Sequence, residues 1–134
     1  MKKLNKQSAV IFNKIIQQLN GSDHIIIDNS EGTFMSLYVE KLYDVKNFIG
    51  YPGTVYSMSH YFEQNGDLVP DPDMTFLFVN DDTIYPLTFQ DQYGYQRGLW
   101  NDEGKWMINK KVQDDMVNFG NMWLKNLKEQ QNLV

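Results

Sequence analysis

The side chains of this sequence that could do chemistry are concentrated in residues 59–76, Ser-His-Tyr-Phe-Glu-Gln-Asn-Gly-Asp-Leu-Val-Pro-Asp-Pro-Asp-Met-Thr-Phe. An imidazole close to a carboxylate can transfer protons, so His60, Glu63 and Asp67 are the candidate catalytic residues. Alternation along a strand places His60 and Glu63 on opposite faces unless a bulge intervenes, which argues against a ready-made acid–base pair. His60 is therefore either a half-buried histidine with its hydrogen bonds satisfied or a ligand and proton-transfer group, and the alternation favours the first.

The aspartates of the same segment, Asp67, Asp71 and Asp73, suggest a cation site because hard cations need several converging oxygens. Their spacing, D-x-x-x-D-x-D, does not match a calcium loop, and Asp commonly bonds the amides of turns. Zinc is disfavoured because the chain has no cysteine and its two histidines form no H-x-x-x-H pair. We expect turn chemistry, with no metal and no cofactor. A metal-dependent hydrolase remains the alternative function, and it would use His60, Glu63, Asp67, Asp71 and Asp73.

Aromatic residues follow this segment, and they include Tyr85, Phe89, Tyr93, Tyr95, Trp100 and Trp106. Tyrosine and tryptophan are enriched in protein interfaces, whereas base stacking is usually accompanied by Lys and Arg. Protein contact and completion of a small core both remain open for these residues. The candidate binding residues are Tyr61, Glu63, Asn65, Asp67, Asp71, Asp73, Asp91 and Tyr93.

The charge of the chain is strongly segregated. Residues 1–20 carry +4, residues 21–104 carry −11 and residues 105–134 carry +2, which gives a net charge of −5. Nucleic-acid backbones are bound by clustered Lys and Arg, so the acidic centre and the single arginine argue against a nucleic-acid partner.

Length and composition indicate one cytoplasmic domain that spans residues 1–134. No apolar run approaches the roughly 18 residues that a membrane span needs. The lysine-rich start is followed by polar residues, so we expect neither a signal peptide nor a membrane anchor. The absence of cysteine rules out disulfides and thiolate chemistry and fits a reducing compartment.

Two amphipathic helices are predicted at the ends of the chain. Residues 8–19 place apolar side chains on one face, and Asn20-Gly21 suits a left-handed helix stop. Residues 107–130 carry an apolar stripe with steps of three and four residues. Gly120 lies inside this second helix, where close packing would explain a residue that costs about 1 kcal/mol relative to alanine.

Strands are predicted between the helices, at residues 24–28, 34–42, 54–64, 74–80 and 83–89, with a further short strand near residues 95–100. Residues 44–53 are expected to form a longer connection. Short turns between consecutive strands favour an antiparallel meander. The predicted fold is therefore α+β with two layers, in which about five strands form the sheet and both terminal helices pack on one face. The opposite face would be partly exposed and would carry acidic and aromatic residues.

Motifs of common enzymes are missing. The glycines fit neither a phosphate-binding loop nor a dinucleotide fingerprint, and there is no G-x-S-x-G elbow. A triad built from Ser57 or Ser59 with His60 fails because neighbours on one strand cannot adopt that geometry. We therefore expect a non-enzymatic domain.

Residues 60–68, His-Tyr-Phe-Glu-Gln-Asn-Gly-Asp-Leu, followed by Asp-Pro-Asp-Met at 71–74, carry a family resemblance. They resemble the signature H-Y-[YF]-E-Q-N-G-D-L-x-x-D-P-[DE]-M of an uncharacterised bacterial family found on plasmids, conjugative elements and phages. Residues 89–94 resemble a looser continuation. The resemblance implies an accessory role in transfer, maintenance or countering host defence such as restriction or CRISPR nucleases. It implies no catalytic residues.

Together these features predict a mobile-element accessory protein that acts as a protein-interaction domain, as a monomer or a small homo-oligomer. The partner would contact the acidic, aromatic face of the sheet and the hairpin around residues 63–73.

Overall fold

The computed structural model describes residues 1–28 and 35–130. Its elements, in chain order, are α1 (Lys6–Gln17), β1 (His24–Ile27), β2 (Leu37–Phe48), β3 (Tyr51–Gln64), β4 (Asp67–Asn80), β5 (Thr83–Asp91), β6 (Gly94–Arg97), β7 (Leu99–Asp102), β8 (Lys105–Ile108) and α2 (Lys110–Gln130). No helix in the described part of the chain combines the length and apolar character needed to cross a membrane.

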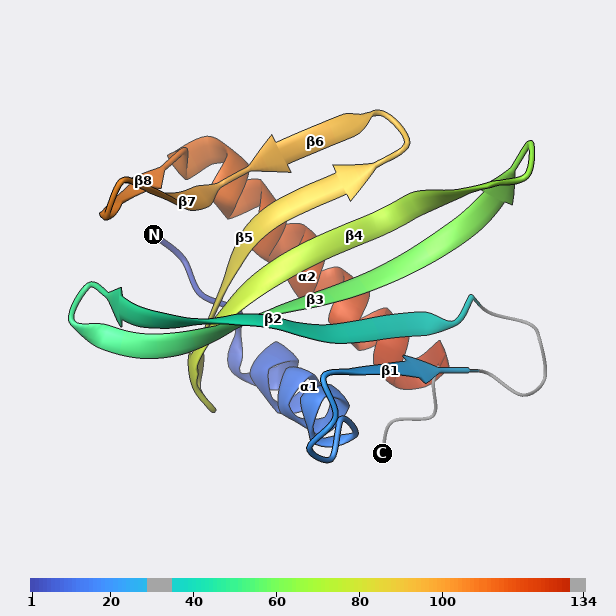
Figure 1. Ribbon diagram of the computed structural model, residues 1–134, viewed down its shortest axis with the longest axis horizontal. Helices are drawn as coiled ribbons and strands as arrows, with labels where there is room; N and C mark the ends of the chain where they lie inside the picture. The colour runs from blue at the N-terminus through green and yellow to red at the C-terminus, as the bar shows by residue number, and fades with distance from the viewer. Residues whose placement is uncertain (29–34, 131–134) are drawn as a thin grey trace.

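The strands form an antiparallel meander, as predicted, but with more members. In the described residues β1 to β6 make one six-stranded sheet in sequence order, and β7 pairs with β8 in a separate two-stranded sheet. Both helices pack on one face of the larger sheet (Figure 1). The α+β class is therefore confirmed, and the expected number of about five strands is roughly right. The single strand predicted near residues 95–100 is instead two short strands that belong to different sheets.

The helix ends follow from local hydrogen bonding and backbone geometry. The Asn5 side chain accepts a hydrogen bond of 2.8 Å from the Ser8 amide and so caps α1. The predicted stop after α1 is confirmed, since Asn20 has a φ of 47° and Gly21 a φ of 86°. The predicted start of the second helix at residue 107 is wrong, because Lys105–Ile108 forms β8 and pairs with β7.

Two predicted connections are in fact strand. Residues 44–53 were expected to form a loop, but β2 and β3 run through them and turn tightly at Ile49 and Gly50, whose φ angles are 48° and 88°. The aspartate-rich residues 67–73 were expected to provide turn chemistry, but they form the first half of β4. Leu68 and Val69 pair there with Glu63 and Phe62 of β3. The hairpin β3–β4 is therefore long, and its tip projects past the rest of the sheet in Figure 1.

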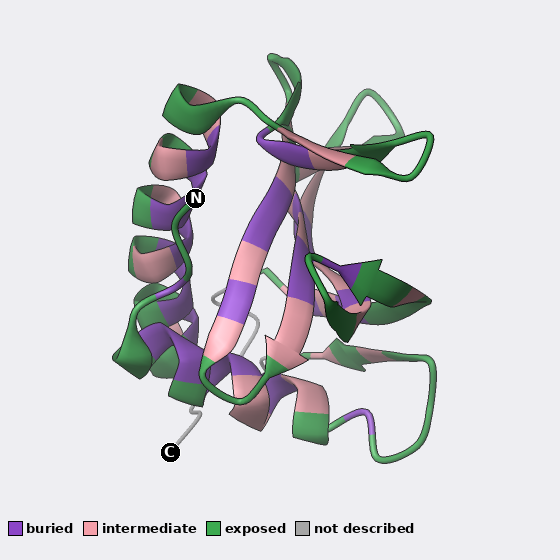
Figure 2. Cartoon of the chain, turned by 90° about the vertical axis from the view of Figure 1, so that its left-hand side faces the viewer, coloured by how far each residue is buried: buried purple, intermediate pink, exposed green. Residues whose placement is uncertain are grey.

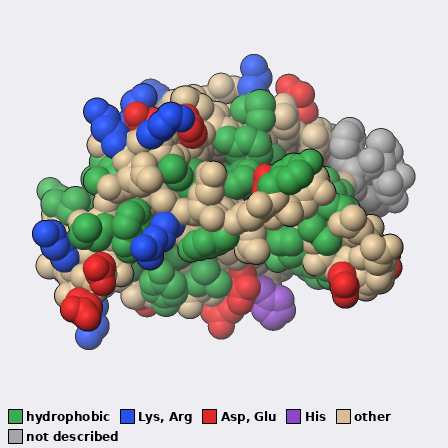
Figure 3. All heavy atoms as spheres, turned by 90° about the horizontal axis from the view of Figure 1, so that it is seen from above, with side chains coloured by type: hydrophobic (Ala, Val, Ile, Leu, Met, Phe, Trp, Pro, Cys, Tyr) green, Lys and Arg blue, Asp and Glu red, His purple; other side chains and the backbone are tan. Residues whose placement is uncertain are grey.

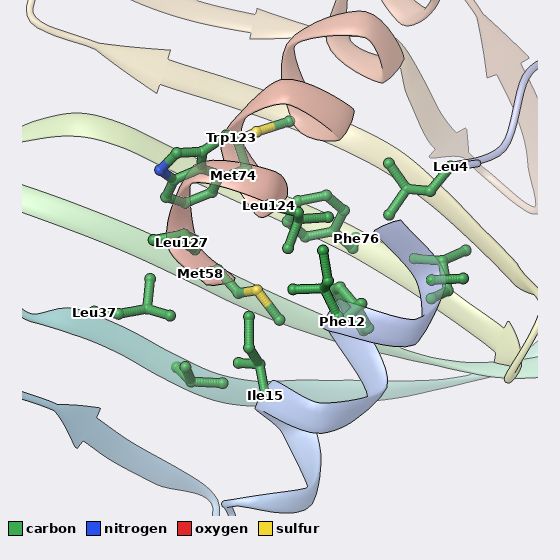
Figure 4. Packing of buried hydrophobic residues seen from close by; sticks show 14 of the residues in the cluster. Leu4, Phe12, Ile15, Leu37, Met58, Met74, Phe76, Trp123, Leu124 and Leu127 are labelled. Carbon is green, nitrogen blue, oxygen red and sulfur yellow. The ribbon is translucent and has the colours of Figure 1, made fainter. Parts of the chain in front are cut away.

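The main core lies between the sheet and the helices (Figure 2). A helix-facing row crosses five strands in register, and it consists of Ile25, Val39, Met58, Met74 and Phe89. Phe12 of α1 meets Phe76 of β4 edge-on, with ring centroids 5.2 Å apart (Figure 4). Close packing at Gly120 is confirmed, since a Cβ there would lie 3.2 Å from Leu4 Cδ2.

A second, smaller core covers one end of the other face. It consists of Phe48, Val55, Leu77, Leu87 and Leu99. The β7–β8 hairpin closes it, because Trp106 packs edge-on against Phe48 at 4.7 Å and donates a hydrogen bond of 3.2 Å to the Asn47 carbonyl. The face opposite the helices is therefore only partly open. Of the aromatic residues left undecided by the sequence, Tyr85, Phe89 and Trp106 pack against the cores, whereas Tyr93 and Tyr95 are exposed.

Candidate functional site

His60 lies on the helix-covered face of β3, at a point where the register with β4 shifts between Ser59 and Tyr61. Its ring meets the Trp123 indole of α2 edge-on, with centroids 5.5 Å apart, and the residue is only 4% exposed. Its Nε2 atom is buried and has no hydrogen-bond partner in the described part of the chain. Burial lowers the pKa of His60, and the charge of Asp71 opposes this shift in part. His60 is thus buried more deeply than expected, and among the described residues its Nε2 atom lacks the hydrogen bond that was expected.

The other two candidate catalytic residues lie away from His60. Glu63, Asn65 and Asp67 are exposed around the β3–β4 turn, where Asn65 has a φ of 54° and Gly66 a φ of 86°. Asp71 is exposed on β4. Within residues 1–28 and 35–130, no three His or acidic side chains gather closely enough to hold a metal ion. The arrangement therefore gives no support to the metal-dependent hydrolase.

Asp73 lies on the opposite, open face of the sheet, where the strand register builds two continuous rows. The first row consists of His24, Glu40, Ser57, Thr75, Thr88 and Arg97. The second consists of Ile26, Tyr38, Ser59, Asp73, Gln90 and Tyr95. Residues directly opposite each other on antiparallel strands share a face and touch through their side chains. The open face is thus a band of hydroxyl, carboxylate and aromatic groups.

This band contains a groove of about 440 Å³. Glu40 and Asp73 line it together with Ser57 and Ser59. The rings of Tyr38 and Tyr61 form its aromatic part and meet edge-on at 5.2 Å. Figure 3 views the molecule from above and shows acidic side chains beside a histidine at its lower edge. His24 and Glu40 both line the groove. We call this groove the open-face groove, and its polar and aromatic lining includes Tyr38, Glu40, Ser57, Ser59, Tyr61 and Asp73.

Of the two carboxylates in the groove, that of Asp73 has a shifted pKa. Its partial burial raises its pKa, and the nearby Glu40 charge raises it further. Neither residue takes part in an ion pair within the described residues. Carboxylates whose pKa is shifted by burial and by a neighbouring charge are common at functional sites.

Asp91 and Tyr93 form a separate feature at the β5–β6 turn. The Asp91 carboxylate accepts a hydrogen bond of 2.9 Å from the Tyr93 amide, which holds the turn. The Tyr93 side chain is 88% exposed, so it is available for contact. Of the eight predicted binding residues, only Tyr61 and Asp73 line the open-face groove, while the others lie at the hairpin tips or on the exposed edge of β4.

Sequence reasoning missed four groove residues, Tyr38, Glu40, Ser57 and Ser59. The alternation of each strand does place Tyr38 with Glu40 and Ser57 with Ser59. The missing information is the register between strands, which brings β2, β3 and β4 together at this point.

Replacement of Asp73 by asparagine is expected to stabilise the domain slightly at pH 7. The pKa of Asp73 is raised by folding, so the folded state is favoured while the carboxyl is protonated and loses stability as the pH rises through the folded pKa. Asparagine removes the charge and keeps the shape. Because the site is partly exposed, we expect a gain below about 1 kcal/mol, or roughly 4 °C or less in melting temperature. Thermal denaturation of D73N beside the exposed control D102N measures it, and a clear loss of stability in D73N alone would contradict this account.

Comparison with known proteins identifies a family. A family described as a domain of unknown function (DUF6908) matches residues 10–133 of the chain. No curated protein and no solved structure shows a significant match.

Proposed function

The chain belongs to the DUF6908 family of domains of unknown function, and we propose that it is a protein-binding domain whose contact surface is the open face of the sheet. The proposed surface includes the open-face groove and the two hairpin tips that carry Glu63, Asp67 and Tyr93.

The observation that carries this proposal is the groove on the face that the helices leave uncovered. Interfaces are rich in tyrosine and need polar groups that can be paired on contact. The groove offers Tyr38 and Tyr61 beside the unpaired carboxylates of Glu40 and Asp73. His60 points into the opposite layer against Trp123, so it does not serve this face.

The biological setting that we propose is a mobile genetic element, with a partner in host defence. The resemblance of residues 60–74 to a signature found on plasmids, conjugative elements and phages supports this setting. A nuclease of a restriction or CRISPR system presents basic surfaces that bind nucleic-acid backbones. The acidic segment 21–104, with its charge of −11, would complement such a surface electrostatically.

Alanine substitutions on the proposed surface test the function. We expect Y61A, E63A, D67A and Y93A, combined in one variant, to weaken the capture of a specific partner in pull-down by at least about tenfold, because contact aromatic residues dominate binding energy. A matched variant with exposed changes on the helix side, V10A and M122A, should capture it normally. Equal capture of every partner by both variants would refute the proposed surface.

A further inference from the structure

The open-face groove contains two carboxylates that lack a counter-charge. Glu40 and Asp73 both line it, and the repulsion between them raises the pKa of Asp73. The lysine nearest in sequence, Lys41, is on the adjacent position of β2 and pairs instead with Asp44 at 3.9 Å. Arg97 lies at the far end of the first row and stacks over Trp100, with its guanidinium carbon 4.2 Å from the ring centroid. The described residues thus leave the charge of this groove uncompensated.

A serine hydroxyl that has no protein partner among the described residues also lines the groove. Ser59 is only 3% exposed, and the groove is where its side chain reaches open space. No side-chain hydrogen bond of the described residues involves this hydroxyl, and it is not one of the fully buried unpaired atoms, so it is open to the groove. In contrast, the hydroxyls of Thr75 and Thr88 in the neighbouring row bond to each other. Ser59 therefore offers an oxygen that a ligand in the groove can use.

The positions of these three oxygens follow from the register. Ser59 is opposite both Tyr38 and Asp73, and Glu40 is opposite the neighbouring Ser57. Adjacent strands lie about 4.8 Å apart, so the acceptors come from three consecutive strands around one small space. An ammonium group has three donors and no acceptor, which matches three oxygen acceptors of this kind. The tyrosine rings supply surface for an aliphatic stem and for cation–π contact.

We propose that the open-face groove binds a lysine side chain of the protein partner. The ammonium group donates to Glu40, Asp73 and Ser59, while the stem lies against Tyr38 and Tyr61. This inference rests on the proposed function and names the chemistry that the partner must present.

Amide chemical shifts of the isotope-labelled full chain, titrated with a tetralysine peptide, test the proposal. We expect shifts concentrated at residues 38–40, 57–59 and 73–75. The double variant E40Q/D73N should bind the peptide roughly tenfold more weakly, since charge-assisted hydrogen bonds are lost. The control D81N/D82N removes the same amount of charge from the exposed β4–β5 turn and should bind as the wild type does. Equal binding by E40Q/D73N and D81N/D82N would overturn the proposal.

Three further probes define the ligand. A tetrapeptide of Nε-acetyl-lysine should cause no shifts in the groove, and a tetra-arginine peptide should bind more weakly than tetralysine. Spermidine tests a free amine, and stronger binding of spermidine than of the peptide would overturn the assignment to a partner's side chain. S59A should weaken tetralysine binding without loss of the folded spectrum, and unchanged binding would remove Ser59 from the site.

Pull-down with the groove variant separates this inference from the proposed function. If E40Q/D73N captures the partner as the wild type does while the Y61A/E63A/D67A/Y93A variant loses it, the lysine pocket is wrong and the binding face stands. If both variants capture it normally, the binding face itself is wrong.

Discussion

Replacement of Phe76 by alanine is expected to destabilise the domain by about 3–5 kcal/mol. Phe76 is fully buried at the centre of β4, and its ring packs against Phe12 of α1 (Figure 4). Its loss would leave a cavity where the sheet and the helices meet. Since domains of this size are stable by only about 5–15 kcal/mol, the variant would lose a large part of its stability.

Equilibrium denaturation in urea measures this effect. Leu68 is a matched control, because it lies on the same strand but is 66% exposed near the hairpin tip. L68A should differ from the wild type by less than about 0.5 kcal/mol. Similar destabilisation by F76A and L68A would contradict the packing described for the main core.

The second large effect is the loss of stability in acid, for which His60 is responsible. Folding lowers the pKa of His60 from its ordinary value of 6.5. Below pH 6.5 the unfolded chain therefore binds a proton at His60 that the folded chain does not bind. Stability is therefore fully present above pH 6.5 and declines as the pH falls. One proton contributes a slope of at most about 1.4 kcal/mol per pH unit.

The variant H60L should abolish this slope, because leucine fills the space against Trp123 and does not titrate. Denaturation curves between pH 7.5 and 5.5 would measure it. H24L is the matched control, since His24 is exposed on the edge strand β1 and its loss should leave the slope unchanged. A slope retained in H60L, or removed in H24L, would show that His60 does not cause the loss of stability in acid. The charge of Asp71 opposes the shift, so D71N should steepen the decline.

Local patterns predicted most of the fold. The apolar stripes of α1 and α2, the Asn20-Gly21 stop and the run of strands depend on residues close in sequence, and these features were found as predicted. The errors occurred where pairing overrides local preference. Residues 44–53 contain proline and glycine, and residues 67–73 contain proline and aspartate, yet both segments are mostly strand because they pair with β3 or β2.

The site could be predicted only in part. Alternation left open which face of the sheet His60 points to, because a register shift between Ser59 and Tyr61 interrupts the strand there. Tyr61 and Asp73 line one groove, which only the pairing of β3 with β4 shows. Glu40 and Asp73 belong to strands that are not neighbours, so no spacing in the sequence shows that their charges interact. The histidine, acidic and turn residues of the segment 59–76 pointed to a site at the tip of the β3–β4 hairpin. The groove lies further from the tip, on the same two strands and on β2.

If the open face contacts a partner and the helix side does not, site-specific photo-crosslinking will show it. A photoreactive phenylalanine analogue would replace Tyr61 or Tyr95 on the open face, or Val10 or Met122 on the exposed side of the helices. We expect a discrete partner to be crosslinked from Tyr61 and Tyr95 and not from Val10 or Met122. Crosslinking of that partner from the helix positions alone would contradict this expectation.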